Sequence, residues 1–330
     1  MLDILANNDW KRPIYFTGGS YNDAEYLWMK EYLQLDGLVY KLVPIRTKIP
    51  KNNPYKLGKI DSELMYKIVK EWEWGNSNDP NIYHDPETRK NSISFRGNLH
   101  RLSLKLLEEG EIKKSEEILD LSLDKMPVDY FGFYSLLEPY ISTYYKLKKF
   151  KKGDQLFISL SNKYQQNLKY YSTLSKSKDS RFSIYTYAEN IITDTERYRS
   201  LVEAALNSNN TNFIGQAIED YIKSTDYVKE FYGEYEYYTL LIPFIESIYK
   251  YGSMELSKDL YINISNELRN RLILFDEMES ENQSEYIENI ANNLFQYTKI
   301  LNILKENESD DSFIKSEIET FLFIKEKLTN

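Results

Sequence analysis

The chain has 330 residues, with 42 Lys and Arg against 51 Asp and Glu and no cysteine. A net charge of −9 argues against general nucleic acid binding, which needs a basic face. The absence of cysteine excludes disulfides, thiol catalysis and cysteine-ligated zinc. No apolar run reaches the roughly 18 residues of a membrane helix, and the start lacks the basic and apolar regions of a signal peptide.

Residues 1–60 predict a small α/β element and a connector. Arg12–Thr17 and Gly37–Pro44 suit strands, and Ala24–Leu35 between them suits a helix. This βαβ-type order allows the two strands to pair in parallel. Prolines then break the chain into an extended connector, at Pro44, Pro50 and Pro54.

Residues 61–330 predict a helical repeat domain. Ser62–Trp74 suits a helix whose apolar face contains Leu64, Ile68 and Trp72. A turn-rich loop follows, and Asp85-Pro86-Glu87 is a typical helix start. Further helices are expected at Tyr185–Asn207, Phe213–Tyr232, Gln283–Lys305 and Phe313–Leu328.

Leu99–Pro127 matches the spacing of a tetratricopeptide repeat with Gly110 in its turn. Small residues are needed where the two helices cross closely, and serines occupy those places here. The positions predicted to face inward are Leu99, Leu102, Ser103, Leu106, Ser115, Leu119 and Ser122.

The sequence contains two similar copies of one predicted helical hairpin, at Phe133–Asn167 and Tyr237–Arg271. Leu137 and Ile141 of the first copy correspond to Leu241 and Ile245 of the second. Self-similarity of this length is typical of stacked helical units, so we expect a mainly α, tetratricopeptide-like solenoid after the α/β element. The equivalent Pro139 and Pro243 are expected to start or kink the first helix of each copy in the same manner.

Residue patterns for catalysis and metal binding are weak. His84, beside Asp85, and His100 are isolated, and we interpret them as a loop residue and an exposed helical residue. Gly18-Gly19-Ser20 lacks the spacing of a phosphate loop, which favours a strand-ending turn. The 30 tyrosines suit either helix packing, which we favour, or a binding groove.

Five features in chain order resemble one family of large bacterial membrane proteins of unknown function, related to protein O-mannosyltransferases. They are Asn8–Phe16, Tyr32–Pro44, Trp74-Gly75-Asn76, the Tyr83–Asp85 loop and the repeat that begins at Arg96. The resemblance extends to about Ser172. It implies a catalytic membrane domain of the GT-C glycosyltransferase type before this region, and Met1 as an internal methionine or the start of a truncated frame.

The resemblance also implies an extracytoplasmic, periplasmic location and a partnership with the parent's membrane domain. Around the first motif we expect a rigid corner in which Arg12 stacks on aromatic rings, or else a phosphate-binding site. The residues concerned are Trp10, Arg12, Pro13 and Tyr15. No catalytic residue, metal or cofactor is expected within this chain.

Three functions remain open. The preferred one is a non-catalytic domain of a membrane glycosyltransferase that recruits a protein or peptide acceptor. The second is a free-standing tetratricopeptide-like adaptor that binds a peptide. The third is a helical glycan-active enzyme that uses two carboxylates and the tyrosines of Tyr227–Tyr238.

Overall fold

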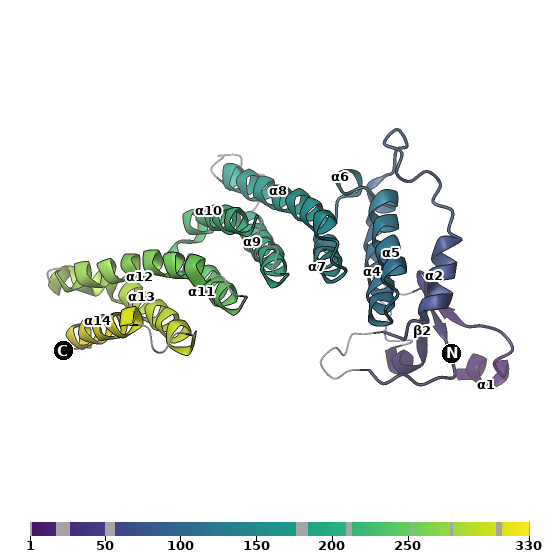
Figure 1. Ribbon diagram of the computed structural model, residues 1–330, viewed down its shortest axis with the longest axis horizontal. Helices are drawn as coiled ribbons and strands as arrows, with labels where there is room; N and C mark the ends of the chain where they lie inside the picture. The colour runs from purple at the N-terminus through teal and green to yellow at the C-terminus, as the bar shows by residue number, and fades with distance from the viewer. Residues whose placement is uncertain are drawn as a thin grey trace. The chain divides into compact units, whose positions relative to one another are not determined.

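The fold is that of a computed structural model, which describes residues 2–17, 27–49, 57–175, 184–208, 213–251, 254–277, 280–307 and 312–329. Within these ranges the protein is mainly helical, and the named strands belong to one small N-terminal sheet (Figure 1). This confirms the predicted fold class. The chain divides into two compact units, Met1–Gly153 and Asp154–Asn330.

The sheet contains β1 (Tyr15–Phe16), β2 (Leu33–Asp36) and β3 (Val39–Leu42) in the order β1-β3-β2. Both strand pairs are antiparallel, so the parallel pairing expected from the sequence is wrong. A tight turn at Gly37, where φ is +68°, folds β3 back along β2 and makes this pair a hairpin. β1 then pairs with the other edge of β3.

The helix expected over Ala24–Leu35 is wrong in its second half. A 3₁₀-helix, η2 (Leu27–Tyr32), leads directly into β2. Leu33 and Leu35 of β2 are completely buried, and this tertiary packing outweighs their helix propensity. Residues 18–26, which include the strand-ending turn predicted at Gly18-Gly19-Ser20, lie outside the described residues.

α2 (Ser62–Lys70) is shorter than predicted and buries a different face. Met65 and Val69 are completely buried, whereas Leu64 is 38% exposed. The helix packs against β2 and α4 (Ser92–Glu108), and these neighbours decide which of its faces is covered. The apolar spacing that included Leu64 therefore predicted the helix correctly. It did not predict which face of the helix is buried.

α4 and α5 (Ile112–Lys125) form the helical hairpin predicted around Gly110, and they lie side by side (Figure 1). Gly110 has a φ of +82° in the turn. Every position predicted to face inward is buried: Leu99, Leu102, Ser103, Leu106, Ser115, Leu119 and Ser122. The hairpin is confirmed, and its assignment to the tetratricopeptide type stays a prediction.

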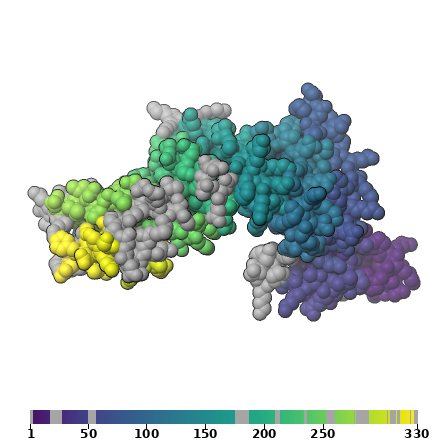
Figure 2. Space-filling view, in the orientation of Figure 1, coloured from purple at the N-terminus to yellow at the C-terminus, as the bar shows by residue number. Residues whose placement is uncertain are grey.

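A single hydrophobic core joins the sheet to this hairpin. Leu33 of β2 and Leu99 and Leu102 of α4 are among its buried members. Figure 2 shows the N-terminal segment, in purple and blue, packed against the helices that follow it. The boundary expected at residue 60 falls inside this first unit, because residues on both sides of it share the core.

Short elements complete the first unit. They are α1 (Leu2–Asn8), α3 (Pro86–Lys90), α6 (Val128–Phe131), the 3₁₀-helix η3 (Tyr134–Leu137), α7 (Glu138–Lys146) and the start of α8 (Phe150–Ser175). α3 begins as predicted, since the Asp85 side chain accepts hydrogen bonds from the amides of Glu87 and Thr88.

The second unit contains most of α8 and the helices that follow it. They are α9 (Ile184–Asn207), α10 (Ile214–Tyr232), α11 (Glu234–Lys250), α12 (Met254–Asp276), α13 (Ser280–Asn307) and α14 (Ser312–Thr329). From α9 onward each helix packs against the next, and several also contact the next but one. No helix in the described part of the chain has the length and apolar character needed to span a membrane.

The two copies of the repeated hairpin share their burial pattern. Leu137 and Leu241 are both completely buried, and so are Ile141 and Ile245. The equivalence of their prolines is wrong in detail: Pro139 lies in the first turn of α7, whereas Pro243 lies inside α11. The difference arises because residues 134–137 form η3, while residues 234–242 are already α-helical.

Candidate functional site

The residues predicted as a binding corner lie in the turn between α1 and β1. Trp10, with a φ of +56°, is 57% exposed, and Arg12, Pro13 and Tyr15 are also exposed. The Asn8 side chain donates to the Arg12 carbonyl (2.7 Å) and accepts from the Arg12 amide (3.3 Å). Among the described residues, Arg12 does not stack on Trp10 or Tyr15. Hydrogen bonds between the Asn8 side chain and the Arg12 backbone therefore hold this corner, and a binding role for it stays a prediction.

His84 lies in the loop before α3, as expected. Its Nδ1 is 3.1 Å from the Ile82 carbonyl oxygen, and its ring packs against Tyr130 and Phe131. Because a carbonyl oxygen only accepts, Nδ1 carries the proton in the neutral ring. Within the described residues, no group of three or more His, Cys, Asp or Glu side chains is arranged to hold a metal.

His100 is not the exposed helical residue that we expected. Its Nε2 lies 3.0 Å from the Thr143 hydroxyl oxygen, and its ring stacks on Tyr140 at 5.3 Å. Burial lowers the pKa of His100 to about 4. The imidazole is therefore neutral at physiological pH and serves as a packing element between α4 and α7.

Arg96, where the family resemblance places the start of a repeat, is completely buried. Its guanidinium donates to the carbonyl oxygens of Met126 (2.9 Å), Gly132 and Phe133 (3.2 Å). Burial lowers the pKa of Arg96 to about 10. These contacts tie α4 to the segment after α5, so the role of Arg96 is structural.

Two of the motifs quoted for the resemblance meet in an aromatic pocket of the first unit. Trp74 and His84 both line a cavity of about 440 Å³, together with Trp72 and Phe95. The rings of Trp72, Trp74 and Phe95 lie 5.4–5.5 Å apart, so each supports the others. The sequence placed these residues in chain order but did not show that they share a cavity.

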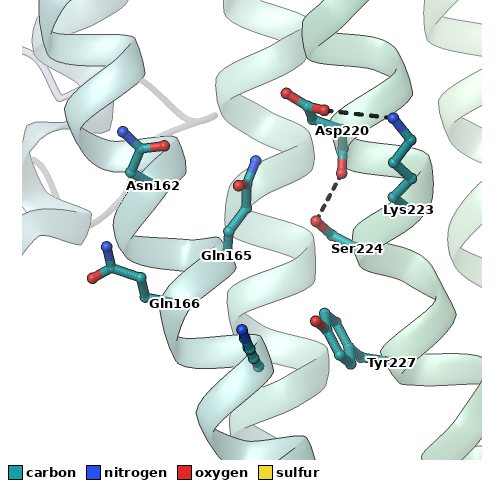
Figure 3. Close-up of a pocket in the computed structure, with 8 residues that line it drawn as sticks. Asn162, Gln165, Gln166, Asp220, Lys223, Ser224 and Tyr227 are labelled. Carbon is teal, nitrogen blue, oxygen red and sulfur yellow. Dashed lines mark hydrogen bonds and ion pairs between the residues drawn. The ribbon is translucent and has the colours of Figure 1, made fainter.

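The second unit contains a polar groove between α8 and α10, with a volume of about 320 Å³ (Figure 3). α8 contributes Asn162, Gln165, Gln166 and Lys169. α10 contributes Asp220, Lys223, Ser224 and Tyr227. The groove is therefore lined mainly by side chains that form hydrogen bonds.

Internal hydrogen bonds fix part of this groove. Gln165 Nε2 donates to the Tyr198 hydroxyl (2.8 Å), and the Ser224 hydroxyl donates to the Asp220 carbonyl (2.8 Å). Lys223 lies 4.0 Å from Asp220. By contrast, the exposed amides of Asn162 and Gln166 have no hydrogen-bond partner among the described residues. Both amides are therefore available to a ligand.

Sequence reasoning missed this groove, although a signal was present. Polar residues recur at 162, 165, 166 and 169 and again at 220, 223, 224 and 227, which is the spacing of one helix face. Two such faces become a groove only when the helices pack together. Many tyrosines in the described part of the chain are buried in helix packing, including Tyr198 and Tyr221, as the packing interpretation predicts, while Tyr227 lines the groove.

Comparison with known families finds a relationship at the N-terminus. Residues 1–64 match the family model of TMEM260-associated domain 2. The match links this segment to the TMEM260 family, which is related to protein O-mannosyltransferases. Neither a curated protein nor a solved structure matches the chain.

The matched segment bears on the resemblance in part. It contains the first two quoted motifs, Asn8–Phe16 and Tyr32–Pro44, and with them the corner at Arg12. The motifs at Trp74 and His84 lie beyond it. The relation to membrane glycosyltransferase-like proteins is therefore supported for the N-terminal segment alone.

Proposed function

We propose that this chain is a non-catalytic binding region of a membrane glycosyltransferase-like protein, and that the α8–α10 groove binds an extended segment of a protein acceptor or partner. The observation that carries the proposal is the pair of unpartnered amides, Asn162 and Gln166, at the groove. Each amide offers two donors and one acceptor oxygen, which match the N–H and C=O groups of an extended peptide.

The neighbouring groups suit the same ligand. Tyr227 offers a partly exposed ring and hydroxyl to a passing side chain, and Lys169 offers positive charge. A peptide held by backbone contacts is recognised with little dependence on its sequence. That property suits a domain that presents varied acceptors to one enzyme.

The family match supports the membrane context of this proposal. In that context the chain lies on the extracytoplasmic, periplasmic side and adjoins the membrane domain of its parent, where the transfer chemistry takes place. Both histidines are engaged in packing contacts, which is the reason to assign chemistry to the membrane domain. The glycan-active alternative requires two acids facing each other across an aromatic cleft.

A peptide-library selection on the purified chain tests the groove. Enriched peptides are titrated against the wild type and the Asn162→Ala, Gln166→Ala double variant. Loss of two hydrogen bonds of about 1 kcal/mol each should weaken binding by about tenfold or more. Gln155→Ala is the matched control, because Gln155 is an exposed amide on the same helix outside the groove. Equal affinity for the double variant and the wild type would exclude the groove.

The adaptor alternative predicts the same peptide binding but a different consequence. If the chain serves a glycosyltransferase, the double variant placed in the parent protein should lower glycosylation of a folded protein acceptor more than that of a short peptide. Short peptides do not depend on remote docking. Unchanged glycosylation of both, with peptide binding lost, would favour the free-standing adaptor.

A further inference from the structure

A second polar cavity, in the first unit, has a charge opposite to that of the whole chain. It lies between the sheet, the segment at residues 57–60 and α4, and its volume is about 540 Å³. Its lining contains five basic side chains and one acidic one: Lys30, Lys48, Lys59, Arg101, Lys105 and Glu108. In a chain with a net charge of −9, this is a local concentration of positive charge.

Arg101 is the fixed element of the cavity. Its Nη1 donates to the Tyr40 hydroxyl (2.8 Å), and its Nη2 donates to the Leu57 carbonyl (2.6 Å). The guanidinium also lies over the Tyr40 ring, 5.9 Å from its centroid. These partners are neutral, and no carboxylate pairs with Arg101 among the described residues. Its charge is therefore held in place without being neutralised.

Lys59 is fixed through its backbone. The Lys59 amide donates to the Leu33 carbonyl (2.8 Å), and the Lys59 carbonyl accepts from the Leu35 amide (2.9 Å). Gly58 permits this close approach, because it has a φ of +68° and a Cβ there would lie 2.7 Å from the Leu33 carbonyl oxygen. The Lys59 ammonium forms no ion pair within the described part of the chain.

The other basic residues differ in their availability. Lys105 is paired with Glu108 (3.7 Å) and Glu109 (3.2 Å), so its charge is already balanced. Lys48 is exposed and has no acidic partner among the described residues. The uncompensated charge of the cavity thus rests on Lys48, Lys59 and Arg101.

We propose that this cavity binds a phosphate-bearing anion, with the phosphoryl oxygens held by Arg101 and Lys59 and the outer charge neutralised by Lys48. The planar guanidinium has N–H groups left after its two protein contacts, and such a fork matches phosphate geometry. A multiply charged ligand is favoured over a single carboxylate, because three cations line the cavity. Positioning of the Arg101 guanidinium before binding reduces the entropy lost on association.

Calorimetric titration of the full chain with inorganic pyrophosphate tests the proposal. Saturable binding is expected, weakened by added NaCl because salt screens the charges. Arg101→Gln and Lys59→Gln should each weaken binding by about tenfold, as expected for the loss of a charge-assisted hydrogen bond. Lys90→Gln removes the same charge at an exposed position outside the cavity, so it should leave the affinity within about twofold.

Lys48→Gln and Lys59→Gln are expected to fold normally, since neither side chain has a structural ion pair among the described residues. A loss of binding in these variants therefore reports on the cavity and not on misfolding. A parallel arm measures sedimentation with vesicles of phosphatidylglycerol and of neutral phosphatidylcholine. Binding to anionic vesicles alone, lost in Lys59→Gln, would assign the phosphate to a lipid headgroup. Binding of neither pyrophosphate nor anionic vesicles, or an equal loss in Lys90→Gln, would overturn the proposal.

Discussion

The hydroxyl oxygens of Ser103 and Ser115 lie 2.9 Å apart where α4 crosses α5. Each hydroxyl is also within hydrogen-bonding distance of the other residue's carbonyl, at 3.0 Å and 2.8 Å. Both residues are completely buried. The reciprocal contact satisfies two buried hydroxyls at a point where only small side chains fit.

At the serine pair we predict that the free energy of unfolding depends strongly on side-chain size. Ser103→Ala should lower the free energy of unfolding by about 1 kcal/mol, through loss of a buried hydrogen bond. Ser103→Val should cost about 2–3 kcal/mol more, because added methyl groups overpack the crossing. Urea unfolding measures both values. Equal stability of the two variants would show that the helices do not cross closely here.

The repeated hairpin predicts matched effects in its two copies. Leu137→Asp and Leu241→Asp should each lower the free energy of unfolding by about 4 kcal/mol, because each buries an unpaired carboxylate. Ile158→Asp is the control, since Ile158 is 52% exposed. Thermal unfolding compares the three variants. Wild-type melting temperatures for Leu137→Asp or Leu241→Asp would contradict the alignment of the copies.

The two equivalent prolines predict opposite responses. Pro243→Ala should raise the free energy of unfolding by about 1–3 kcal/mol, because proline inside a helix removes a backbone donor. Pro139→Ala should change it by less than about 0.5 kcal/mol, because proline is well suited to the first turn of a helix. Chemical denaturation distinguishes them, and identical shifts would mean that the two prolines have the same role.

Because buried His100 is neutral, we predict that the free energy of unfolding falls at acidic pH. The folded-state pKa is about 4, below the ordinary value of 6.5, so the unfolded chain binds a proton that the folded chain does not. This contribution is fully present above pH 6.5 and is lost as the pH falls towards 4. The loss amounts to about 3 kcal/mol for a shift of this size.

His100→Gln isolates this contribution from the carboxylates that titrate in the same range. Glutamine retains a group that bonds Thr143 but does not titrate. Between pH 7 and pH 4 the unfolding free energy of the wild type should fall by about 2–3 kcal/mol more than that of the variant. A constant difference across that range would show that His100 is solvated in the folded state.

Several elements were predictable because they depend on local chemistry. The Asp85-Pro86 helix start, the turn at Gly110 and the inward face of α4 all follow from residue type and spacing. The repeated hairpin was predictable for a similar reason, since the same apolar spacing buries Leu137 and Leu241 in both copies. For these elements, short-range geometry leaves few alternatives.

The candidate sites depend on contacts between distant segments. Asn162 and Gln166 were indistinguishable from other exposed polar residues until α10 was placed beside α8. Arg101 and Lys59 share a cavity only because residues 57–60 pair with β2.

Composition and periodicity by themselves determined that the protein is helical after its first segment, and which positions are apolar enough to be buried. Only the tertiary structure decided the antiparallel sheet, the buried face of α2 and the neutral state of His100. Local propensities differ by less than about 1 kcal/mol per residue, whereas burial of one large apolar side chain contributes about 1.5–3 kcal/mol. Where the two conflict, as at Leu33 and Leu35, packing between distant segments prevails.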